Sequence, residues 1–543
     1  DAIFINRWEG SGMCYCEHCH ANFKAATGHE LPRGATTLQD PVRRAYFFWR
    51  QQRLFALWRQ WDAAVRAINP DSCVVPNTAG GPSGSLDMAR IGELAPTIAA
   101  DRQARHGPAP LWFAGRSAKE YRAVMADKPV IGLSGVGLEE PYRWKDSVQA
   151  PAELKLWMID ALANGARPWF VKFAGHLEDP RWLEPVAEFY DWCHRAERYL
   201  RNTRSLARVG VVYSQQSLWF GANHARVDDA GLGWYQALVE ARVPFELVHD
   251  RRLDAADLAP FRTLILPNLV ALSDAQCAQL RAFAARGGSL VATAATSLAD
   301  ESGAPRRDFG LADLFGVRFT RTLEGPIQNA YIRLEHDRAP DHPLLRGLAD
   351  APRTIAGTWR VEVEATAKFP APPLTLIPSY PDLPMEKVYA RQPQTDIAQV
   401  FLRELPGGGR VAYLPWDLDR TFWETLDVDH GMLLQNTVAW ATNEPAPVLV
   451  RGPGVLDVTC WQQKDSVTVH LVNLTNPMLM HGPIRDYFPV GEQQLSIRLP
   501  AGVHAKSVRL LVTGAAPAFQ QAGDIVELAV PSITAHEVVA IDV

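Results

Sequence analysis

The sequence predicts an α/β fold: the C-terminal part of a (β/α)₈ TIM barrel, then a flavodoxin-like α/β domain, then a small C-terminal β-sandwich. Over residues 1–206, short apolar runs alternate with long amphipathic segments, which is typical of a parallel sheet covered by helices. A second set of buried strands and helices follows over 207–445. From 446 to 543, short strands with alternating apolar and polar side chains dominate.

The first region contains five expected strands and four expected helices. The strands are 1–6, 73–77, 97–100, 129–134 and 168–173, and the helices are 41–68, 118–125, 151–164 and 182–200. This series matches the later part of a barrel better than a complete fold, so we expect three earlier units before Asp1. The opening run DAIFIN looks like a buried strand and has no initiator Met or signal segment before it, which also suggests upstream sequence.

The second region has the element order of a flavodoxin-like domain. Strands are expected at ARVGVVYS, PFELV, FRTLILPN and GGSLVATA, with helices at 231–241 and 273–286. The run GGGRVAYLPWDLD could return to the same sheet. The six strands of the third region are expected at LDVTCWQQ, SVTVHLVNLT, QQLSIRLP, SVRLLVTG, IVELAVP and HEVVAIDV.

Composition excludes several classes of protein. The 543 residues are enough for two to four domains, and 47% hydrophobic with 21% charged residues is ordinary for globular chains. A net charge of −5 provides no polybasic field, so we expect no nucleic-acid partner. No apolar run approaches the roughly 20 residues of a membrane span, so we expect no membrane partner. Seventeen Trp and 13 Tyr supply flat faces on which sugar rings can stack, although Trp is equally a core residue.

The cysteines predict a metal site. The chain has seven cysteines, an odd number. Three lie close together in sequence and the other four are scattered, which does not resemble a disulfide framework. We therefore expect reduced thiols and a cytoplasmic setting. The motif Cys14-Tyr15-Cys16-Glu17-His18-Cys19-His20 places three soft ligands within reach of one Zn²⁺, and a His or an upstream Cys could be the fourth. Thiolates would close such a site and make it structural. The alternative is a thiol cluster without metal.

A candidate acid follows the first strand. The segment Asn6-Arg7-Trp8-Glu9-Gly10 leaves the carboxyl end of that strand, which is the catalytic face of barrel enzymes. A partly buried Glu9 beside an aromatic ring could serve as general acid. Alternatively, Glu9 pairs with Arg7 or caps the following turn.

Further carboxylates follow later strands. Glycoside hydrolysis needs two carboxylates that face each other across one glycosidic bond. The candidates are Asp101, then Glu139 and Glu140, then Glu178 and Asp179. Any one of them could instead be a salt-bridge or loop residue. Four further residues are expected on the same face, where they could contact a sugar, although Trp169 could equally be a core residue: Trp8, Trp144, Trp169 and His176.

The sequence predicts a non-catalytic middle region. It contains no phosphate loop of the G-x-x-x-x-G-K type and no G-x-S-x-G nucleophile elbow. The strand end LPNLVALS lacks the Cys of a glutaminase-like enzyme, which argues against an amidotransferase. We expect no organic cofactor.

Together these features resemble the family 42 β-galactosidases and their relatives among hypothetical glycoside hydrolases. The resemblance rests on NRWEGSGMCYCEHC, on LANGARPWFVKFAGHLEDPRW and on the middle run from ARVGVVYS to GRVAYLPWDLD. It implies a homotrimer assembled by the middle domain, with a neighbouring subunit helping to wall the active site. It also implies a Zn²⁺ site at Cys14, Cys16 and Cys19, with a further Cys ligand from earlier in the barrel.

The catalytic residues depart from the family's pattern. The family places its acid/base Glu directly after an Asn, whereas here Asn6 is followed by Arg7 and the nearest carboxylate is Glu9. We therefore expect a divergent retaining glycosidase in which Glu9 is the acid/base, Glu140 the nucleophile and Asp101 the substitute for either. Its carbohydrate substrate would contact Asn6, Arg7, Trp8, Trp144 and His176. The alternative is a non-catalytic carbohydrate-binding or scaffold protein, which Arg7 at the expected Glu position would favour.

Overall fold

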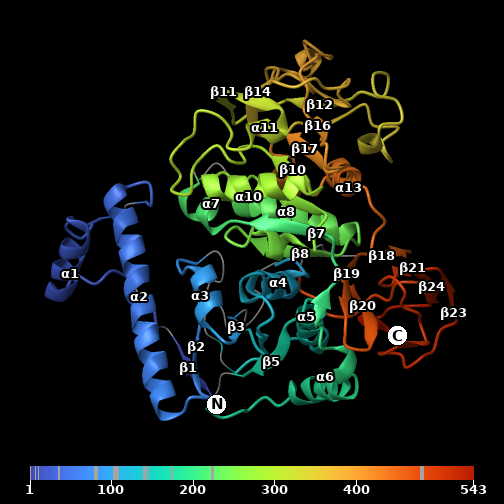
Figure 1. Ribbon diagram of the computed structural model, residues 1–543. Coiled ribbons are helices and arrows are strands. Elements are labelled where there is room, and N and C mark those ends of the chain that lie inside the picture. The colour runs from blue at the N-terminus through green and yellow to red at the C-terminus, as the bar shows by residue number, and fades with distance from the viewer. Residues whose placement is uncertain are drawn as a thin grey trace. The chain divides into compact units, whose positions relative to one another are not determined.

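The computed structural model describes residues 2–6, 8–9, 12–34, 37–78, 84–101, 109–138, 144, 146–172, 175–221, 226–476 and 482–543 (Figure 1). It divides into two compact units. Unit 1 comprises 1–205, 451–494 and 501–543, and unit 2 comprises 206–450 with 495–500. This differs from the three consecutive domains expected from the sequence, because most of the C-terminal strands pack with the first region.

Five parallel strands in chain order form the first part of unit 1. They are β1 (Ala2–Ile5), β2 (Cys73–Pro76), β3 (Ile98–Asp101), β4 (Val130–Gly135) and β5 (Arg167–Val171). A single parallel bridge between Asn77 and Ala99 joins β2 to β3. This is the order that consecutive strands have in a (β/α)₈ barrel, although the described strands do not close into one. Their carboxyl ends lie at one edge.

The first strand differs from its prediction. The sequence predicts a buried strand, but Ile3 and Phe4 are 52% and 42% exposed, because β1 pairs with only one described strand, β2. The Phe4 ring meets Trp169 of β5 edge-on, with centroids 6.2 Å apart. Both rings are partly exposed.

Helices separate these strands in sequence. They are α1 (Glu17–Thr27), α2 (Pro41–Ile68), α3 (Met88–Leu94), α4 (Phe113–Met125), α5 (Pro151–Ala163) and α6 (Leu183–Arg195). The bounds of α2 agree with the prediction because its start is encoded locally: Asp40 accepts a hydrogen bond from the Arg43 amide, and Pro41 is the first helical residue. By contrast, α6 ends before Leu200 and is followed by a 3₁₀ turn, Glu197–Tyr199.

The C-terminal part of unit 1 contributes an antiparallel sheet in the order β22-β25-β20-β19-β6. Its strands are β6 (Arg204–Ser205), β19 (Leu456–Gln462), β20 (Ser466–Asn473), β22 (Ser507–Leu510) and β25 (His536–Asp542), and β23 (Phe519–Ala522) pairs with β24 (Ile525–Val530). Two more strands, β18 (Val448–Arg451) and β21 (Gln493–Arg498), lie at the chain boundaries between the units.

Buried polar groups join β19 to α5. The Asn164 side-chain amide donates to Asp457 at 3.0 Å and lies 3.3 Å from an Asp160 oxygen. Burial, and then the neighbouring Asp457 charge, raise the pKa of Asp160 well above its usual range. The side chains of Thr459 and Trp461 both donate to the Ala163 carbonyl, at 2.7 and 2.9 Å. These bonds explain why the last strands belong with the first region.

Unit 2 is built on a six-stranded sheet in the order β16-β17-β10-β9-β7-β8. The strands are β7 (Val209–Tyr213), β8 (Phe245–His249), β9 (Thr263–Leu266), β10 (Ser289–Thr293), β16 (Phe401–Glu404) and β17 (Arg410–Leu414). In chain order, the five parallel strands run 2-1-3-4-5, which is the flavodoxin-like order, and β16 adds an antiparallel edge.

The helices of unit 2 are α7 (Gln215–Phe220), α8 (Val227–Glu240), α9 (Ala255–Leu258), α10 (Asp274–Ala285), α11 (Ala312–Phe315), α12 (Leu418–Thr425) and α13 (Val428–Thr442). A capping box between Ser273 and Gln276 starts α10, in agreement with the predicted helix. Two small sheets complete the unit: β11 (Val317–Glu324) with β14 (Arg360–Ala365), and β12 (Tyr331–Leu334) between β13 (Arg353–Ile355) and β15 (Leu374–Ile377).

Helices α8 and α12 approach each other at a glycine. A Cβ added at Gly233 would meet the Asp419 main-chain oxygen far inside van der Waals contact, whereas a Cβ at Gly231 would have no heavy atom within 4 Å. The buried Asp419 also accepts hydrogen bonds from Trp234 and Thr293, at 2.9 and 2.6 Å. The contact between these helices therefore needs Gly233.

We predict opposite effects for two alanine substitutions on α8. Gly233→Ala should lower the free energy of unfolding by about 1–3 kcal/mol because the packed backbones must separate. Gly231→Ala should leave it unchanged or raise it by up to about 1 kcal/mol, since Ala is the better helix former. Urea unfolding of both variants beside the parent measures this, and equal stability of the two variants would contradict the packing.

Candidate active site

The carboxyl edge of the five-stranded sheet collects most of the predicted site residues. Trp8 and Glu9 follow β1, and Asp101 ends β3. Trp144 lies in the connection after β4, and His176 follows β5. Arg7, Glu139 and Glu140 lie outside the described residues, so their predicted roles remain predictions from sequence.

Trp8 is a core residue in this structure. Its side chain is 8% exposed and packs edge-on against Phe55 and Trp58 of α2, with ring centroids 6.3 and 5.6 Å away. Its indole N–H donates to the Asn77 carbonyl oxygen at 3.0 Å. A ring covered in this way has no face open to a sugar. The sequence places Trp8 beside the site but does not indicate the direction of its ring.

Glu9 is half-buried and contacts two groups from other elements. The Arg50 guanidinium on α2 donates to the Glu9 main-chain oxygen at 2.7 Å. The Ser85 hydroxyl, from the connection between β2 and α3, donates to Glu9 Oε2 at 3.4 Å. Burial raises the pKa of Glu9, and the Arg50 charge and the Ser85 hydrogen bond partly oppose that rise. A carboxyl with a raised pKa suits a general acid.

Asn6 is exposed at the end of β1 and accepts a hydrogen bond from the Asn77 side chain at 2.8 Å. Asp101 is half-buried and pairs in register with Leu133 of β4. It stands two strands from β1 at the same edge, which corresponds to about 10 Å between strand axes.

The connection after β4 is fixed by Ser147 and Lys172. Ser147 accepts a hydrogen bond from the Leu138 amide at 2.7 Å and donates to the Trp144 carbonyl at 2.8 Å. The Lys172 side chain, only 4% exposed, reaches Asp146 at 2.6 Å from the end of β5. These bonds anchor Trp144, whose side chain is 55% exposed and thus available for contact.

The residues after β5 are exposed. His176 lies on the surface, as does Glu178. Hydrogen bonds from Arg181 lower the pKa of Asp179 to about 2, so this carboxyl stays ionised and is bound locally. Asp179 is therefore a poor candidate for an acid.

The three cysteines of the predicted metal site lie together. The Sγ atoms of Cys14, Cys16 and Cys19 are all within 4.8 Å of one another. Cys16 is the N-cap of α1, and a hydrogen bond from the Cys19 amide lowers the pKa of its thiol. Burial and the neighbouring thiols raise the pKa of Cys19 to about 12. Three clustered sulfurs at the end of a helix fit a soft divalent cation.

Unit 2 carries a different polar cluster at the carboxyl edge of its sheet. The Ser214 hydroxyl donates to Asp250 at 2.7 Å, and His249 Nδ1 lies 3.0 Å from the other Asp250 oxygen. Because the serine bonds to the aspartate rather than to the histidine, this is not the arrangement of a nucleophilic triad. Burial lowers the pKa of His249.

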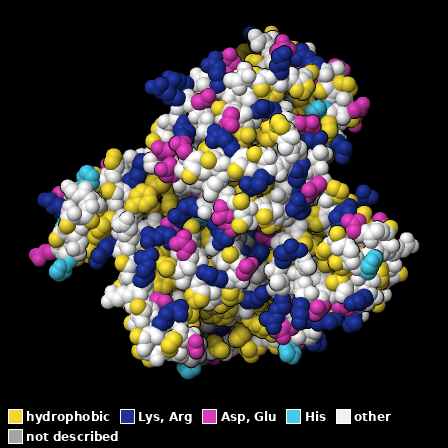
Figure 2. Space-filling view, in the orientation of Figure 1, with side chains coloured by type: hydrophobic (Ala, Val, Ile, Leu, Met, Phe, Trp, Pro, Cys, Tyr) yellow, Lys and Arg dark blue, Asp and Glu magenta, His cyan; other side chains and the backbone are white. Residues whose placement is uncertain are grey.

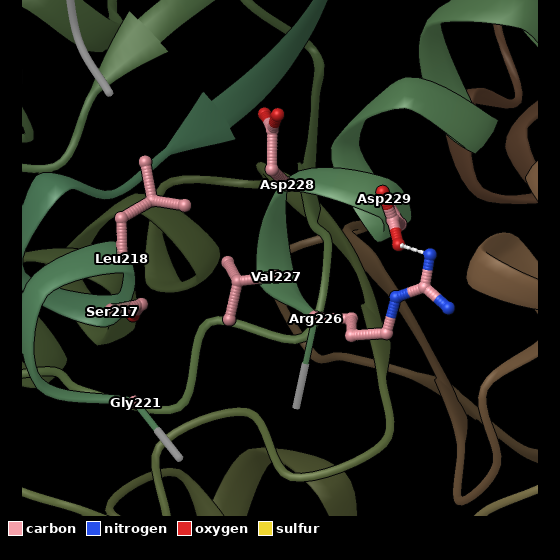
Figure 3. A pocket seen from close by; sticks show the side chains of 7 residues that line it. All are labelled: Ser217, Leu218, Gly221, Arg226, Val227, Asp228 and Asp229. Carbon is pink, nitrogen blue, oxygen red and sulfur yellow. Dashed lines mark ion pairs between the residues drawn. The ribbon is translucent and has the colours of Figure 1, made fainter. Parts of the chain in front are cut away.

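A pocket of about 380 Å³ lies beside this cluster, between α7 and the start of α8 (Figure 3). It is lined by Ser217, Leu218, Gly221, Arg226, Val227, Asp228 and Asp229. Arg226 forms ion pairs with Asp229 and with Glu424 of α12. Since Arg226 pairs with Asp229 and the described lining has no paired nucleophile and base, we assign this pocket no chemistry.

Four residues of the sheet edge were not identified from the sequence: Arg50, Asn77, Ser85 and Lys172. The sequence could have indicated Asn77 and Lys172 as site residues, because each is a polar residue at the end of an apolar strand. No signal existed for Arg50 or Ser85, because each contacts Glu9 across more than 40 positions of sequence.

Sequence comparison matches the middle of the chain. Residues 207–328 match the β-galactosidase trimerisation domain family. A segment of 147 residues is 28% identical to β-galactosidase BbgII of Bifidobacterium bifidum, covering 25% of this chain and 21% of that enzyme. The chain thus aligns with about a fifth of the length of this curated relative.

Structural comparison covers the whole chain. An α-L-fucosidase from Paenibacillus thiaminolyticus aligns with all of this chain and 77% of its own, with a TM-score of 0.73 and 18% identity. A β-galactosidase from Bacillus circulans aligns with 98% of this chain and 78% of its own, with a TM-score of 0.71 and 14% identity. The chain shares the fold of these two glycoside hydrolases. Its middle region resembles the trimerisation domain of β-galactosidases.

The face drawn in Figure 2 interleaves basic and acidic side chains, with no continuous basic field among its described residues. None of the helices in the described part of the chain combines the length and hydrophobicity that a membrane crossing requires.

A pair of tryptophan substitutions distinguishes a core role for Trp8 from a binding role. Trp8→Phe should lower the free energy of unfolding by about 1–2 kcal/mol, because it removes a hydrogen bond and leaves space against α2. Trp144→Phe, at an exposed position, should change it by less than about 0.5 kcal/mol. Chemical denaturation followed by circular dichroism gives both values. If Trp8→Phe cost no stability, the burial described here would be wrong.

Proposed function

We propose that this protein is a glycoside hydrolase that removes a terminal sugar from a small oligosaccharide or glycoside with two carboxylates. The observation that carries the proposal is Glu9, a half-buried carboxyl at the carboxyl edge of a parallel sheet whose fold matches known glycosidases. In TIM-barrel enzymes this edge bears the catalytic residues. The five strands of unit 1 would be the later strands of such a barrel.

In the proposed reaction Glu9 is the acid/base and Glu140 the nucleophile. Glu9 protonates the glycosidic oxygen while Glu140 attacks the anomeric carbon, so the leaving group departs and a glycosyl ester forms. Glu9 then takes a proton from water, whose oxygen breaks the ester and releases the sugar with retained configuration. Asp101, which ends β3 at the same edge of the sheet, is the substitute for either role.

The sugar would lie against the exposed groups of the same edge. Trp144 offers an aromatic face, and Asn6 and His176 offer polar contacts. From the sequence alone, Arg7 is expected to join them. Because the structural relatives include both a β-galactosidase and an α-L-fucosidase, galactosides and fucosides are the first substrates to test. The alternative function is carbohydrate binding without catalysis, which Arg7 favours because it stands where related enzymes carry the acid/base Glu.

An assay on aryl α- and β-glycosides (galactosides, fucosides, arabinosides and glucosides) tests the proposal. We expect turnover of one of them to fall by at least about 10³-fold in Glu9→Gln and in Glu140→Gln, since each removes a group that acts in the transition state. Glu178→Gln, at an exposed position, should retain activity.

Activity that survives both substitutions would refute the assignment of Glu9 as acid/base and Glu140 as nucleophile. The variant Asp101→Asn would then be assayed next. If no glycoside is cleaved but the protein still binds sugars in isothermal titration calorimetry, the carbohydrate-binding alternative replaces the hydrolase.

We also propose a structural Zn²⁺ held by Cys14, Cys16 and Cys19. Bound there, the ion would neutralise the clustered thiolates and tie the N-terminus of α1 to the segment before it. The hydrophobic cluster beneath α1, formed by Phe23, Leu31 and Tyr46, links this segment to α2. The role we assign is stabilisation of α1, and no step of hydrolysis depends on it.

Metal analysis of the purified protein should find about one zinc per chain. In Cys16→Ser the content should fall severalfold, and chelator treatment of the parent should lower its thermal midpoint. Cys193→Ser, at a thiol outside the cluster, is the matched control. An equal zinc content in the parent and in Cys16→Ser would show that this motif does not bind the metal.

Finally, we propose a homotrimer formed through the trimerisation domain at 207–328. Sedimentation equilibrium of the intact protein measures the assembly directly, and a mass other than three chains would contradict it.

A further inference from the structure

Arg50 and Ser85 form a connected set of hydrogen bonds around Glu9. Arg50 uses one guanidinium nitrogen for the Glu9 carbonyl, at 2.7 Å, and the other for the Ser85 hydroxyl, at 3.3 Å. The same hydroxyl donates to the Glu9 carboxylate at 3.4 Å. One guanidinium thus holds the main chain of Glu9 directly and its side chain through Ser85.

The elements that carry these groups are themselves anchored. Residue Gln51, next to Arg50 on α2, accepts a hydrogen bond from the Asp87 amide at 2.7 Å, which fixes the connection that carries Ser85. On the other side, Trp8 packs against Phe55 of the same helix. Helix α2 therefore fixes the residue before Glu9, and it also fixes the connection that reaches the Glu9 carboxylate.

The charge around Glu9 is asymmetric. Within the described part of the chain, Arg50 is the charged side chain that acts on Glu9, and it lowers the pKa of that carboxyl against the rise caused by burial. Removing Arg50 or Ser85 therefore leaves burial less opposed, and the Glu9 carboxyl should hold its proton to higher pH.

We propose that Arg50 and Ser85 are positioning residues for Glu9: together they hold its carboxylate in one orientation at the sheet edge. This inference rests on the proposed function for its catalytic meaning, but the geometry it describes can be tested without activity. In a glycosidase the pair sets where the acid points and the pH up to which it stays protonated.

The first test is the pH dependence of kcat/KM. In Arg50→Gln and Ser85→Ala we expect the basic limb to move up by about half a unit or more. The first substitution removes the charge that lowers the pKa of Glu9, and the second removes the hydrogen bond to its carboxylate. We also expect kcat to fall about tenfold or more as the acid loses its orientation. Arg50→Lys keeps the charge and should keep the limb near its parent position. Arg53→Gln, at an exposed position three residues along α2, is the matched control.

The second test needs no substrate. A water-soluble carbodiimide with glycine ethyl ester labels protonated carboxyl groups, and peptide mass spectrometry follows the labelling of Glu9 against pH. We expect the labelling midpoint to rise in Arg50→Gln and Ser85→Ala and to stay unchanged in Arg53→Gln. The proposal would be overturned if the variants lost activity while the labelling midpoint of Glu9 and the basic limb of the pH profile stayed unchanged. That result would indicate a purely structural role.

These tests keep the two ideas separate. If no glycoside is hydrolysed by the parent, the proposed function fails, while the labelling still decides the positioning. The other case is a parent that is active and depends on Glu9. If the basic limb of its pH profile and the labelling midpoint of Glu9 then stay unchanged in every variant, only the positioning role fails.

Discussion

The burial of Trp8 against α2 is the constraint on which the candidate site depends. Its ring packs against Phe55 and Trp58, and its N–H bonds to the chain just after β2. A buried aromatic contact of this kind joins three elements that sequence alone separates widely. Because Glu9 is the next residue, it has little freedom of its own. Its depth and its neighbours follow from the packing of Trp8, and so does the raised pKa that would suit an acid.

The two units use polar groups in opposite ways. At the sheet edge of unit 2, buried polar side chains bond to one another: Ser214 to Asp250, and Asp419 to Trp234 and Thr293. Buried hydrogen bonds of this kind hold elements of the fold together. In unit 1, Asn6, Trp144 and His176 instead follow different strands of the sheet and have exposed side chains, and Glu9 is half-buried. This contrast supports a scaffold role for unit 2 and a chemical role for unit 1.

The sequence predicted features that local patterns determine. The ends of α2 and the start of α10 were predicted because capping residues and Pro41 encode them. The parallel strands of both units were predicted because apolar runs between turn signals identify them, whereas the short strands between Val317 and Glu404 were not. The prediction did not extend to side-chain direction: Trp8 occupies the expected place after β1, but its ring faces the core. The sequence also could not predict contacts such as that of Arg50 with Glu9. Hydrogen bonds between distant positions follow from packing and leave no periodic pattern in the sequence.

The discontinuity of unit 1 has a consequence for how the protein is made. Unit 2 occupies nearly one stretch of chain, whereas the polar face of α5 bonds to Asp457, 293 positions after Asn164. At ribosomal speeds of about 5–20 residues per second, that partner emerges about 15–60 seconds later. The nascent chain must therefore carry Asp160 and Asn164 uncovered while unit 2 forms. A chain truncated near residue 450 would contain a folded middle and an N-terminal region that chaperones retain.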